Sequence, residues 1–259
     1  IIADKYNISV SELKRANNLR SNNIQAGKIL KIPTGEMQPK SISRSEFIPL
    51  EMKSDELTHF YKSETSLDKI YLIPNKESAD FELNGLVLEN DKPGIIYSSI
   101  GVNGAKFSDY NKYALFFEQL KALKPDMVVL SLGTNETFDK MISSEFMVQL
   151  QLFLTNMKSQ GITIPVLIST PPPSLFQRKF PNTFAADYSE KIIGASEKNN
   201  YAVWDLYSQF GGLYGVNRNA SRGLMAGDKV HYSKAGYEKQ GNLLSEAILS
   251  AFNNFKSGI

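Results

Sequence analysis

One short stretch of the sequence carries residue types that can do acid–base chemistry. Asp228 lies three residues before His231. An acid at this spacing can fold back in one turn and accept the imidazole Nδ1–H, which leaves Nε2 free as a base toward a hydroxyl nucleophile. The only other histidine, His59, has no such surrounding and is interpreted as a surface or partly packed residue. We therefore expect Asp228 and His231 to be the acid–base pair.

Two glycine-rich turns carry groups that can stabilise a negatively charged oxygen. Ester cleavage passes through a tetrahedral oxyanion, which needs hydrogen-bond donors aimed at the developing charge. Gly104, in the turn 99–105, can offer its backbone N–H at close approach. Asn135, in the turn 133–136, can offer its side-chain N–H. Each residue also has a simpler interpretation, because Gly104 can be a plain turn glycine and Asn135 a helix cap.

Alternating strands and helices in residues 94–259 must position these groups. Apolar runs predict strands, and periodic apolar residues predict helices between them. The strands are expected at 94–99, 127–132, 164–169 and 201–206, and the helices around 107–123, 146–157, 188–198 and 243–251. Ser233 is expected to cap the last helix. The alternation predicts an α/β fold, a three-layer α/β/α domain around a parallel sheet, whose ligands bind at the carboxyl ends of the strands.

The first 93 residues divide into three segments. Residues 1–33 predict two helices, the second capped by Ser9 or Ser11, followed by a strand at 28–33 that stops at Pro33. Residues 34–46 are polar and read as a linker. Residues 47–93 contain short apolar runs, such as 69–73 and 81–88, and predict a β-rich segment.

The three candidate site motifs occur in the same order as the conserved blocks of a known hydrolase superfamily. Gly104, Gly133-Thr134-Asn135 and Asp228-x-x-His231 resemble the second, third and last blocks of the SGNH (GDSL-type) hydrolase superfamily, over roughly residues 95–255. The resemblance implies a serine esterase that uses Asp228, His231, Asn135 and Gly104. Residues 98–111 and the loop 171–174 are most similar to bacterial esterases that carry LysM modules and are linked with peptidoglycan O-acetyl groups.

The Gly-Asp-Ser block that supplies the serine in this superfamily is missing from the chain. The only Gly-Asp is Gly227-Asp228, and Ser98 and Ser99 lie too close to the Gly104 turn to be convincing replacements. We expect the nucleophile to lie on an upstream segment that these 259 residues do not include, and residues 1–259 alone to be inactive or nearly so.

Residues 1–33 resemble the LysM module. The pattern runs from Ile2 and Tyr6 through Leu13 and Asn17 to Ile32-Pro33. The resemblance implies binding to glycans that contain N-acetylglucosamine, such as peptidoglycan. LysM modules open with a strand and a Gly-Asp-Thr-like turn, and both are missing here, so the module is expected to be truncated at its N-terminus. A generic helical hairpin is the alternative.

Composition narrows the remaining function classes. With a net charge of +2, positive and negative residues are too nearly balanced to argue for a nucleic-acid partner. The sequence contains no run of about 18 apolar residues, so no membrane span is predicted. The absence of cysteine, with two distant histidines, argues against a typical zinc site, and no cofactor is expected. The oligomeric state is left open. The charges of Arg178, Lys179 and Arg218 are equally consistent with substrate contacts and with a solvated surface.

These observations predict a serine esterase that removes acyl groups from a cell-wall glycan such as peptidoglycan, and acetyl is the acyl group that we expect. The alternative is a non-catalytic glycan-binding protein whose hydrolase domain has degenerated. In either case we expect a secreted or periplasmic protein of a bacterial cell envelope.

Overall fold

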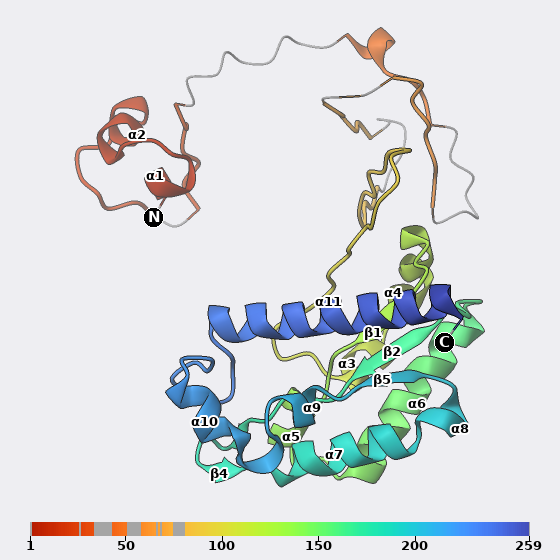
Figure 1. Cartoon of the computed structure of the whole chain (residues 1–259). Coiled ribbons are helices and arrows are strands. Elements are labelled where there is room, and N and C mark those ends of the chain that lie inside the picture. The colour runs from red at the N-terminus through yellow and green to blue at the C-terminus, as the bar shows by residue number, and fades with distance from the viewer. Residues whose placement is uncertain are drawn as a thin grey trace. The chain divides into compact units, whose positions relative to one another are not determined.

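The computed structural model describes residues 2–25, 27–33, 43–50, 58–65, 67, 69–74 and 81–258 (Figure 1). The chain divides into two compact units, Ile1–Lys62 and Ser63–Ile259, and each is described by itself. This division falls within the predicted β-rich segment. Most of the predicted linker lies outside the described residues, and its last three residues form the short 3₁₀ helix η1 (Arg44–Glu46).

The N-terminal unit begins with two short helices, α1 (Ile2–Lys5) and α2 (Val10–Ala16). Ser9 starts α2 with a capping box, in which its side chain accepts from the Glu12 amide at 3.1 Å. The Glu12 carboxylate accepts from the Ser9 amide at 2.8 Å in return. Ala3 and Leu13 are buried between the helices and the following chain. The prediction of two helices, with Ser9 as one of two possible caps, is confirmed.

The strand predicted at 28–33 does not form among the described residues of this unit. Lys31 is held instead by the Asn17 side chain, which accepts from its amide and donates to its carbonyl, both at 2.6 Å. Asn17 also donates to the Leu13 carbonyl at the end of α2. The backbone groups of Lys31 therefore pair with the side chain of Asn17, at the end of α2, rather than with a neighbouring strand.

The C-terminal unit is built on a parallel sheet of three strands. They are β1 (Val128–Leu130), β2 (Val166–Ser169) and β5 (Ala202–Trp204), in the spatial order β1-β2-β5. Val129 pairs with Leu167, and Ile168 pairs with Val203. The strands lie inside three of the predicted apolar runs. A two-stranded hairpin of β3 (Leu175–Phe176) and β4 (Phe180–Pro181) lies outside this sheet.

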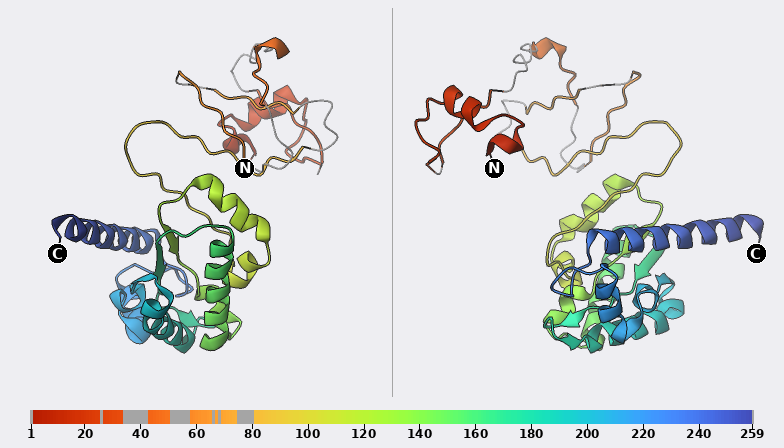
Figure 2. Two further views of the ribbon diagram at one scale, coloured as in Figure 1. Left: turned by 90° about the vertical axis from the view of Figure 1, so that its right-hand side faces the viewer. Right: turned by 60° about the vertical axis from the view of Figure 1, so that its left-hand side comes forward.

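Helices cover the sheet on both sides, as the views in Figures 1 and 2 show. On one side lie α6 (Ser143–Ser159) and α7 (Thr183–Gly194), and on the other lies α11 (Lys234–Ser257). The remaining short helices connect these elements. They are α3 (Phe107–Asn111), α4 (Ala114–Leu120), η2 (Lys121–Leu123), α5 (Thr134–Phe138), α8 (Ser196–Asn199), α9 (Leu206–Gln209), η3 (Gly212–Tyr214) and α10 (Gly215–Ser221). The predicted three-layer α/β/α architecture is confirmed.

The main core lies between the sheet and α6. The predicted apolar positions of this helix, Phe146, Leu150, Phe153 and Met157, are all buried. The ring of Phe146 stacks on Tyr188 of α7 at 4.1 Å between centroids. A second buried cluster, beneath the start of α11, contains Phe210 and Tyr232, whose rings meet edge to face at 5.2 Å.

The strands predicted at 69–73, 81–88 and 94–99 are not formed, and no described residue between 43 and 127 belongs to a strand. These segments have no regular secondary structure, because a strand requires a neighbour whose backbone groups it can pair with. Their apolar side chains are correspondingly exposed, as for Leu88, Ile95 and Tyr97. The predicted β-rich character of 47–93 is therefore incorrect for the residues described.

Two predicted helices also differ from the structure. The helix predicted at 107–123 is broken into α3 and α4, because the Tyr113 amide turns back to the Tyr110 carbonyl and Tyr113 points into solvent. The apolar stripe of α11 is only partly covered. Leu243, Leu244 and Ile248 are half-buried, whereas Ala247 and Ala251 are exposed.

Two glycines of α11 give a matched test of how the start of this helix is packed. A Cβ added to Gly236 would lie 2.0 Å from the Leu224 carbonyl oxygen, whereas one added to Gly241 would meet nothing within 4 Å. We expect Gly236→Ala to lower the free energy of unfolding by about 1–3 kcal/mol, because backbone must move. Gly241→Ala should raise it by about 0.5–1 kcal/mol through helix propensity. Equal effects in denaturant unfolding would contradict this packing.

Candidate active site

The Asp228 carboxylate organises the loop before α11. Its Oδ2 contacts His231 Nδ1 at 2.7 Å, and its Oδ1 accepts from the backbone amides of Val230 and His231, both at 3.0 Å. The hydrogen bonds from the His231 ring and then from the Val230 amide lower the pKa of Asp228 to about 2. The carboxylate therefore stays ionised and fixes the ring, as the spacing predicts.

The ring of His231 is open to solvent on its other side. Its side chain is 61% exposed, and in the part of the chain that the structure describes nothing hydrogen-bonds to Nε2. An imidazole held at Nδ1 by a carboxylate presents a lone pair at Nε2, which is the state that a general base needs.

Backbone hydrogen bonds on both sides make this loop rigid. The Ala226 amide donates to the His231 carbonyl at 2.9 Å, and Met225 and Tyr232 form an antiparallel bridge. Ser233 then caps α11, as predicted, because its side chain accepts from the Gly236 amide at 3.2 Å. The turn requires Lys229 to adopt a left-handed backbone with φ of 54°, which is unusual for a side-chain-bearing residue.

The turns that carry Gly104 and Asn135 lie against each other. Asn135 donates from Nδ2 to the Ala105 carbonyl at 2.8 Å, and Ala105 follows Gly104 directly. Gly104 has φ of +80°, which favours glycine, and open space where a Cβ would be. No described group accepts a hydrogen bond from its amide. The Gly104 amide and the second Asn135 amide hydrogen are thus available as donors in one place.

Glu136 joins the same two turns from beneath, and the residue patterns do not predict it. Its side chain is fully buried, and its Oε1 accepts from the Phe107 amide at 2.9 Å. Burial raises its pKa, because the charged form is poorly solvated there, although the Phe107 amide opposes this. Beside it, Lys106 forms an ion pair with Asp139. The only sequence signal is an acid placed directly after Asn135.

The loop 171–174 connects the oxyanion turns to the histidine loop. A Cβ on Gly133 would lie 3.3 Å from the Pro171 side chain, so this loop packs on the turn that begins α5. At its other end, the Leu175 amide donates to the Lys229 carbonyl at 2.9 Å, and the Tyr232 hydroxyl donates to the Pro173 carbonyl at 2.8 Å. The Asp228–His231 loop and the Gly133 turn therefore flank one loop at the carboxyl end of β2.

A buried polar network holds that loop in place. Asn182 donates from Nδ2 to both Ser174 Oγ and Thr137 Oγ1, each at 3.0 Å. All three side chains are almost fully buried. Because α5 carries both Asn135 and Thr137, this network fixes the loop relative to the candidate oxyanion donor.

The two serines considered as replacement nucleophiles are not placed against the histidine by any hydrogen bond. Ser98 and Ser99 are exposed in the extended segment before Gly104. Within the described ranges, no serine hydroxyl hydrogen-bonds to His231. His59, the other histidine, belongs to the N-terminal unit and is partly buried there.

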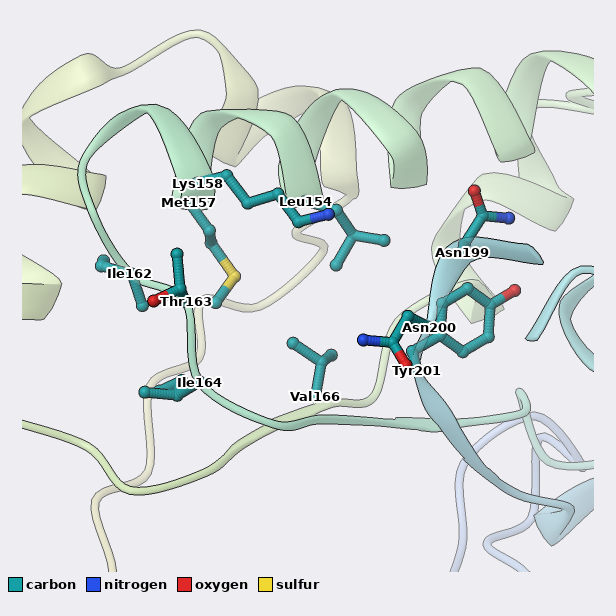
Figure 3. A pocket seen from close by; sticks show the side chains of 10 residues that line it. All are labelled: Leu154, Met157, Lys158, Ile162, Thr163, Ile164, Val166, Asn199, Asn200 and Tyr201. Carbon is teal, nitrogen blue, oxygen red and sulfur yellow. The ribbon is translucent and has the colours of Figure 1, made fainter. Parts of the chain in front are cut away.

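A pocket of about 180 Å³ lies at the opposite edge of the sheet (Figure 3). It is lined by Ile164 and Val166 around the start of β2, by Tyr201 just before β5, and by Leu154 and Met157 of α6. The amino ends of the parallel strands lie at this edge, whereas the loops with Gly133 and Pro171 follow their carboxyl ends. The pocket is walled mainly by apolar side chains and is separate from the candidate active site.

Among the described residues, no group of three or more His, Asp or Glu side chains gathers where it could hold a metal ion. No helix in the described part of the chain is both long and apolar enough to cross a membrane.

Comparison with known proteins gives two family matches. Residues 83–239 match the GDSL-like lipase/acylhydrolase family, and residues 1–33 match the LysM domain. No curated protein matches the chain. One similar solved structure is a peptidoglycan O-acetylesterase, with 21% sequence identity and a TM-score of 0.55. The likeness covers 61% of this chain and 47% of that chain, so it spans less than half the length of that protein.

Two further structures are less similar. A lipase/acylhydrolase from Enterococcus faecalis is 23% identical, with a TM-score of 0.45, over 56% of this chain and 71% of that chain. An acetyl esterase mutant bound to an acetate ion is 14% identical, with a TM-score of 0.46, over 58% of this chain and 70% of that chain.

The family match extends over more than half of the chain and contains Gly104, Asn135, Asp228 and His231. The chain therefore belongs to the GDSL-like lipase/acylhydrolase family and carries a LysM domain at its N-terminus.

Proposed function

We propose that this protein is a carboxylic-ester hydrolase that removes acetyl groups from a cell-wall glycan such as peptidoglycan. The observation that carries the proposal is the imidazole of His231, fixed by Asp228 through Nδ1 and open to solvent at Nε2. The LysM match supports a glycan containing N-acetylglucosamine as the partner and a cell-envelope location. The peptidoglycan O-acetylesterase that shares the fold makes peptidoglycan acetyl esters the first substrates to test.

The residues have distinct roles in this mechanism. His231 Nε2 takes the proton of a serine hydroxyl while the serine oxygen attacks the acetyl carbonyl carbon. The carbonyl oxygen becomes an oxyanion and accepts hydrogen bonds from the Gly104 amide and the Asn135 side chain. Collapse of this intermediate breaks the bond between the carbonyl carbon and the sugar oxygen, and His231 gives the proton to that oxygen, which leaves as the sugar hydroxyl. Water then attacks the acetyl-serine in the same way and releases acetate.

A non-catalytic glycan-binding protein is the second candidate. It is favoured by one observation, namely that no described serine hydroxyl hydrogen-bonds to His231. The intact Asp228–His231 pair and the adjacent Gly104 and Asn135 turns oppose it, since a scaffold has no need to keep an oriented, exposed base. Acetate release from acetylated peptidoglycan by the native protein distinguishes the two candidates.

Replacing the base gives the first activity test. In the native protein, His231→Ala should lower kcat on p-nitrophenyl acetate by about 10³-fold or more, because proton transfer and nucleophile activation are lost together. The matched control is His59→Ala, which removes the other histidine and should leave kcat unchanged. Ser98→Ala and Ser99→Ala should also leave it unchanged. Full activity in His231→Ala would disprove the proposed mechanism.

The oxyanion donor gives a second test. Asn135→Ala should lower kcat by about 100-fold or more with a smaller change in KM, because this donor acts mainly in the transition state. Its hydrogen bond to the Ala105 carbonyl, which holds the Gly104 turn, is lost as well. Asn253→Ala, on the exposed face of α11, is the control. If Asn135→Ala loses no more activity than this control, Asn135 is not an oxyanion donor.

The ionised state of Asp228 is tested through stability rather than activity. Its pKa is lowered in the folded protein, so its stabilisation is present above pH 3.8 and is lost as the pH falls through about 2. The stability difference between the unmodified protein and Asp228→Asn, measured by denaturant unfolding, should shrink across this window. In a His231→Ala background, the stability difference caused by Asp228→Asn should be smaller at every pH. The reason is that the hydrogen bond from the His231 ring, the largest cause of the low pKa of Asp228, is then missing. A pH-independent difference would contradict the assignment.

A further inference from the structure

We propose that the β3–β4 hairpin and the end of α5 form a platform that binds a glycan bearing carboxylate groups, next to the candidate active site. The inference rests on the proposed function and adds the chemical class of the substrate. Three observations carry it: the position of the hairpin, an exposed aromatic surface, and two cations that have no acidic partner among the described residues.

The hairpin is fixed between the two halves of the candidate site. The Leu175 amide, at its first residue, donates to the Lys229 carbonyl of the histidine loop at 2.9 Å. Asn182, directly after its last residue, donates to Thr137 of α5 at 3.0 Å. A glycan whose acetyl group reaches the His231 side of this edge therefore extends naturally over the hairpin or over α5.

Aromatic rings line this part of the surface. Phe138, at the end of α5, is 39% exposed, and its ring centroid lies 6.4 Å from that of half-buried Phe176 in β3. Phe176 in turn lies 5.5 Å from Phe184 of α7, which fixes its ring from behind. An exposed phenyl face supported in this way offers a rigid apolar surface, on which the C–H face of a sugar ring can pack at little cost in side-chain entropy.

The tip of the hairpin presents two cations. Arg178 and Lys179 are exposed, and neither forms an ion pair within the described residues. Lys179 Nζ lies 5.3 Å from the ring of Phe180, which is 50% exposed. By contrast, the acid next to Phe138, Asp139, is already paired with Lys106. The charge on this surface is thus left positive.

The turn itself places Arg178 at a position that does not favour it. Gln177 and Arg178 have φ of 51° and 61°, and the Lys179 amide closes the turn onto the Phe176 carbonyl at 3.1 Å. Two central residues with positive φ define a hairpin turn that favours glycine or asparagine. The turn instead holds a guanidinium at the tip, and a guanidinium binds carboxylates through two parallel hydrogen bonds.

These features together select the ligand class. Packing on Phe138 suits the apolar faces of sugar rings but does not distinguish one glycan from another. Arg178 and Lys179, which form no ion pair with any residue that the structure describes, add a preference for carboxylates along the glycan. Peptidoglycan carries such carboxylates and chitin does not. A small neutral ester contacts neither group, so this platform should affect only glycan substrates.

The test compares kinetics on three substrates in the native protein. For Phe138→Ala and for the double variant Arg178→Gln/Lys179→Gln, we expect KM on soluble O-acetylated peptidoglycan fragments to rise by about 3- to 10-fold. The value of kcat should stay unchanged, and kcat/KM on p-nitrophenyl acetate should not move. On O-acetylated chitin oligosaccharides, Phe138→Ala should still raise KM, whereas the double variant should have little effect.

Matched controls lie in the last turn of α11, whose C-terminal end is at the opposite end of the helix from Ser233 (Figure 1). There Phe255→Ala and Lys256→Gln remove an exposed ring and an exposed cation and should change nothing. The proposal is overturned if the platform variants leave KM on both glycans unchanged, or if the double variant affects chitin and peptidoglycan equally. Calorimetric binding of unacetylated peptidoglycan fragments tests the platform without requiring ester hydrolysis. It therefore distinguishes a failure of the platform proposal from a failure of the esterase proposal. If no ester is hydrolysed but the variants weaken this binding by the same factor, the platform stands and the esterase proposal fails.

Discussion

The hydrogen bond between Asp228 and His231 is the interaction on which the proposed chemistry depends. The carboxylate uses one oxygen for the imidazole and the other for two backbone amides, so neither the acid nor the ring can turn independently. The low pKa of Asp228 follows from these same bonds. The surrounding loop supports the pair without burying it, and the His231 side chain stays 61% exposed.

The rest of the site depends on a sequence of contacts along one edge of the sheet. The histidine loop contacts the segment 171–175, this segment packs on the Gly133 turn, and Asn135 contacts the residue after Gly104. This series of contacts is stabilised by hydrogen bonds among three buried polar side chains, Thr137, Ser174 and Asn182. Beside them, the Glu136 carboxylate accepts a hydrogen bond from the Phe107 amide. The Gly133 turn and the loop 171–174 lie at one edge because β1 and β2 end there. The Gly104 turn and the histidine loop follow no strand of this sheet and are joined to that edge by these contacts.

Local geometry explains which features the sequence could predict. The contact between Asp228 and His231 spans three residues, so spacing alone is sufficient to predict it, and the same is true of the Ser233 cap. For the second helix the sequence narrows the cap to Ser9 or Ser11, and the structure shows that it is Ser9. The bond from Asn135 to Ala105 spans 30 residues and that from Tyr232 to Pro173 spans 59, and no local pattern encodes either. Glu136 was missed for a related reason, since its burial depends on a distant amide.

The incorrect strand predictions share a physical cause. Apolar alternation in 28–33, 81–88 and 94–99 reports a tendency toward extended backbone, but a strand also needs a partner, which the sequence pattern does not supply. The backbone of Lys31 forms hydrogen bonds with the Asn17 side chain instead, and the apolar side chains of 94–99 remain exposed. The break at Tyr113 likewise comes from a backbone turn that periodicity does not register.

The central claim is that Gly104, Asn135 and His231 act on one tetrahedral centre, and a crystal structure of the native protein treated with an organophosphonate ester tests it most directly. The account predicts a serine adduct whose phosphoryl oxygen accepts hydrogen bonds from the Gly104 amide and Asn135 Nδ2, with His231 Nε2 in hydrogen-bond range of the serine oxygen. No adduct, or an adduct whose phosphoryl oxygen points away from both donors, would contradict it.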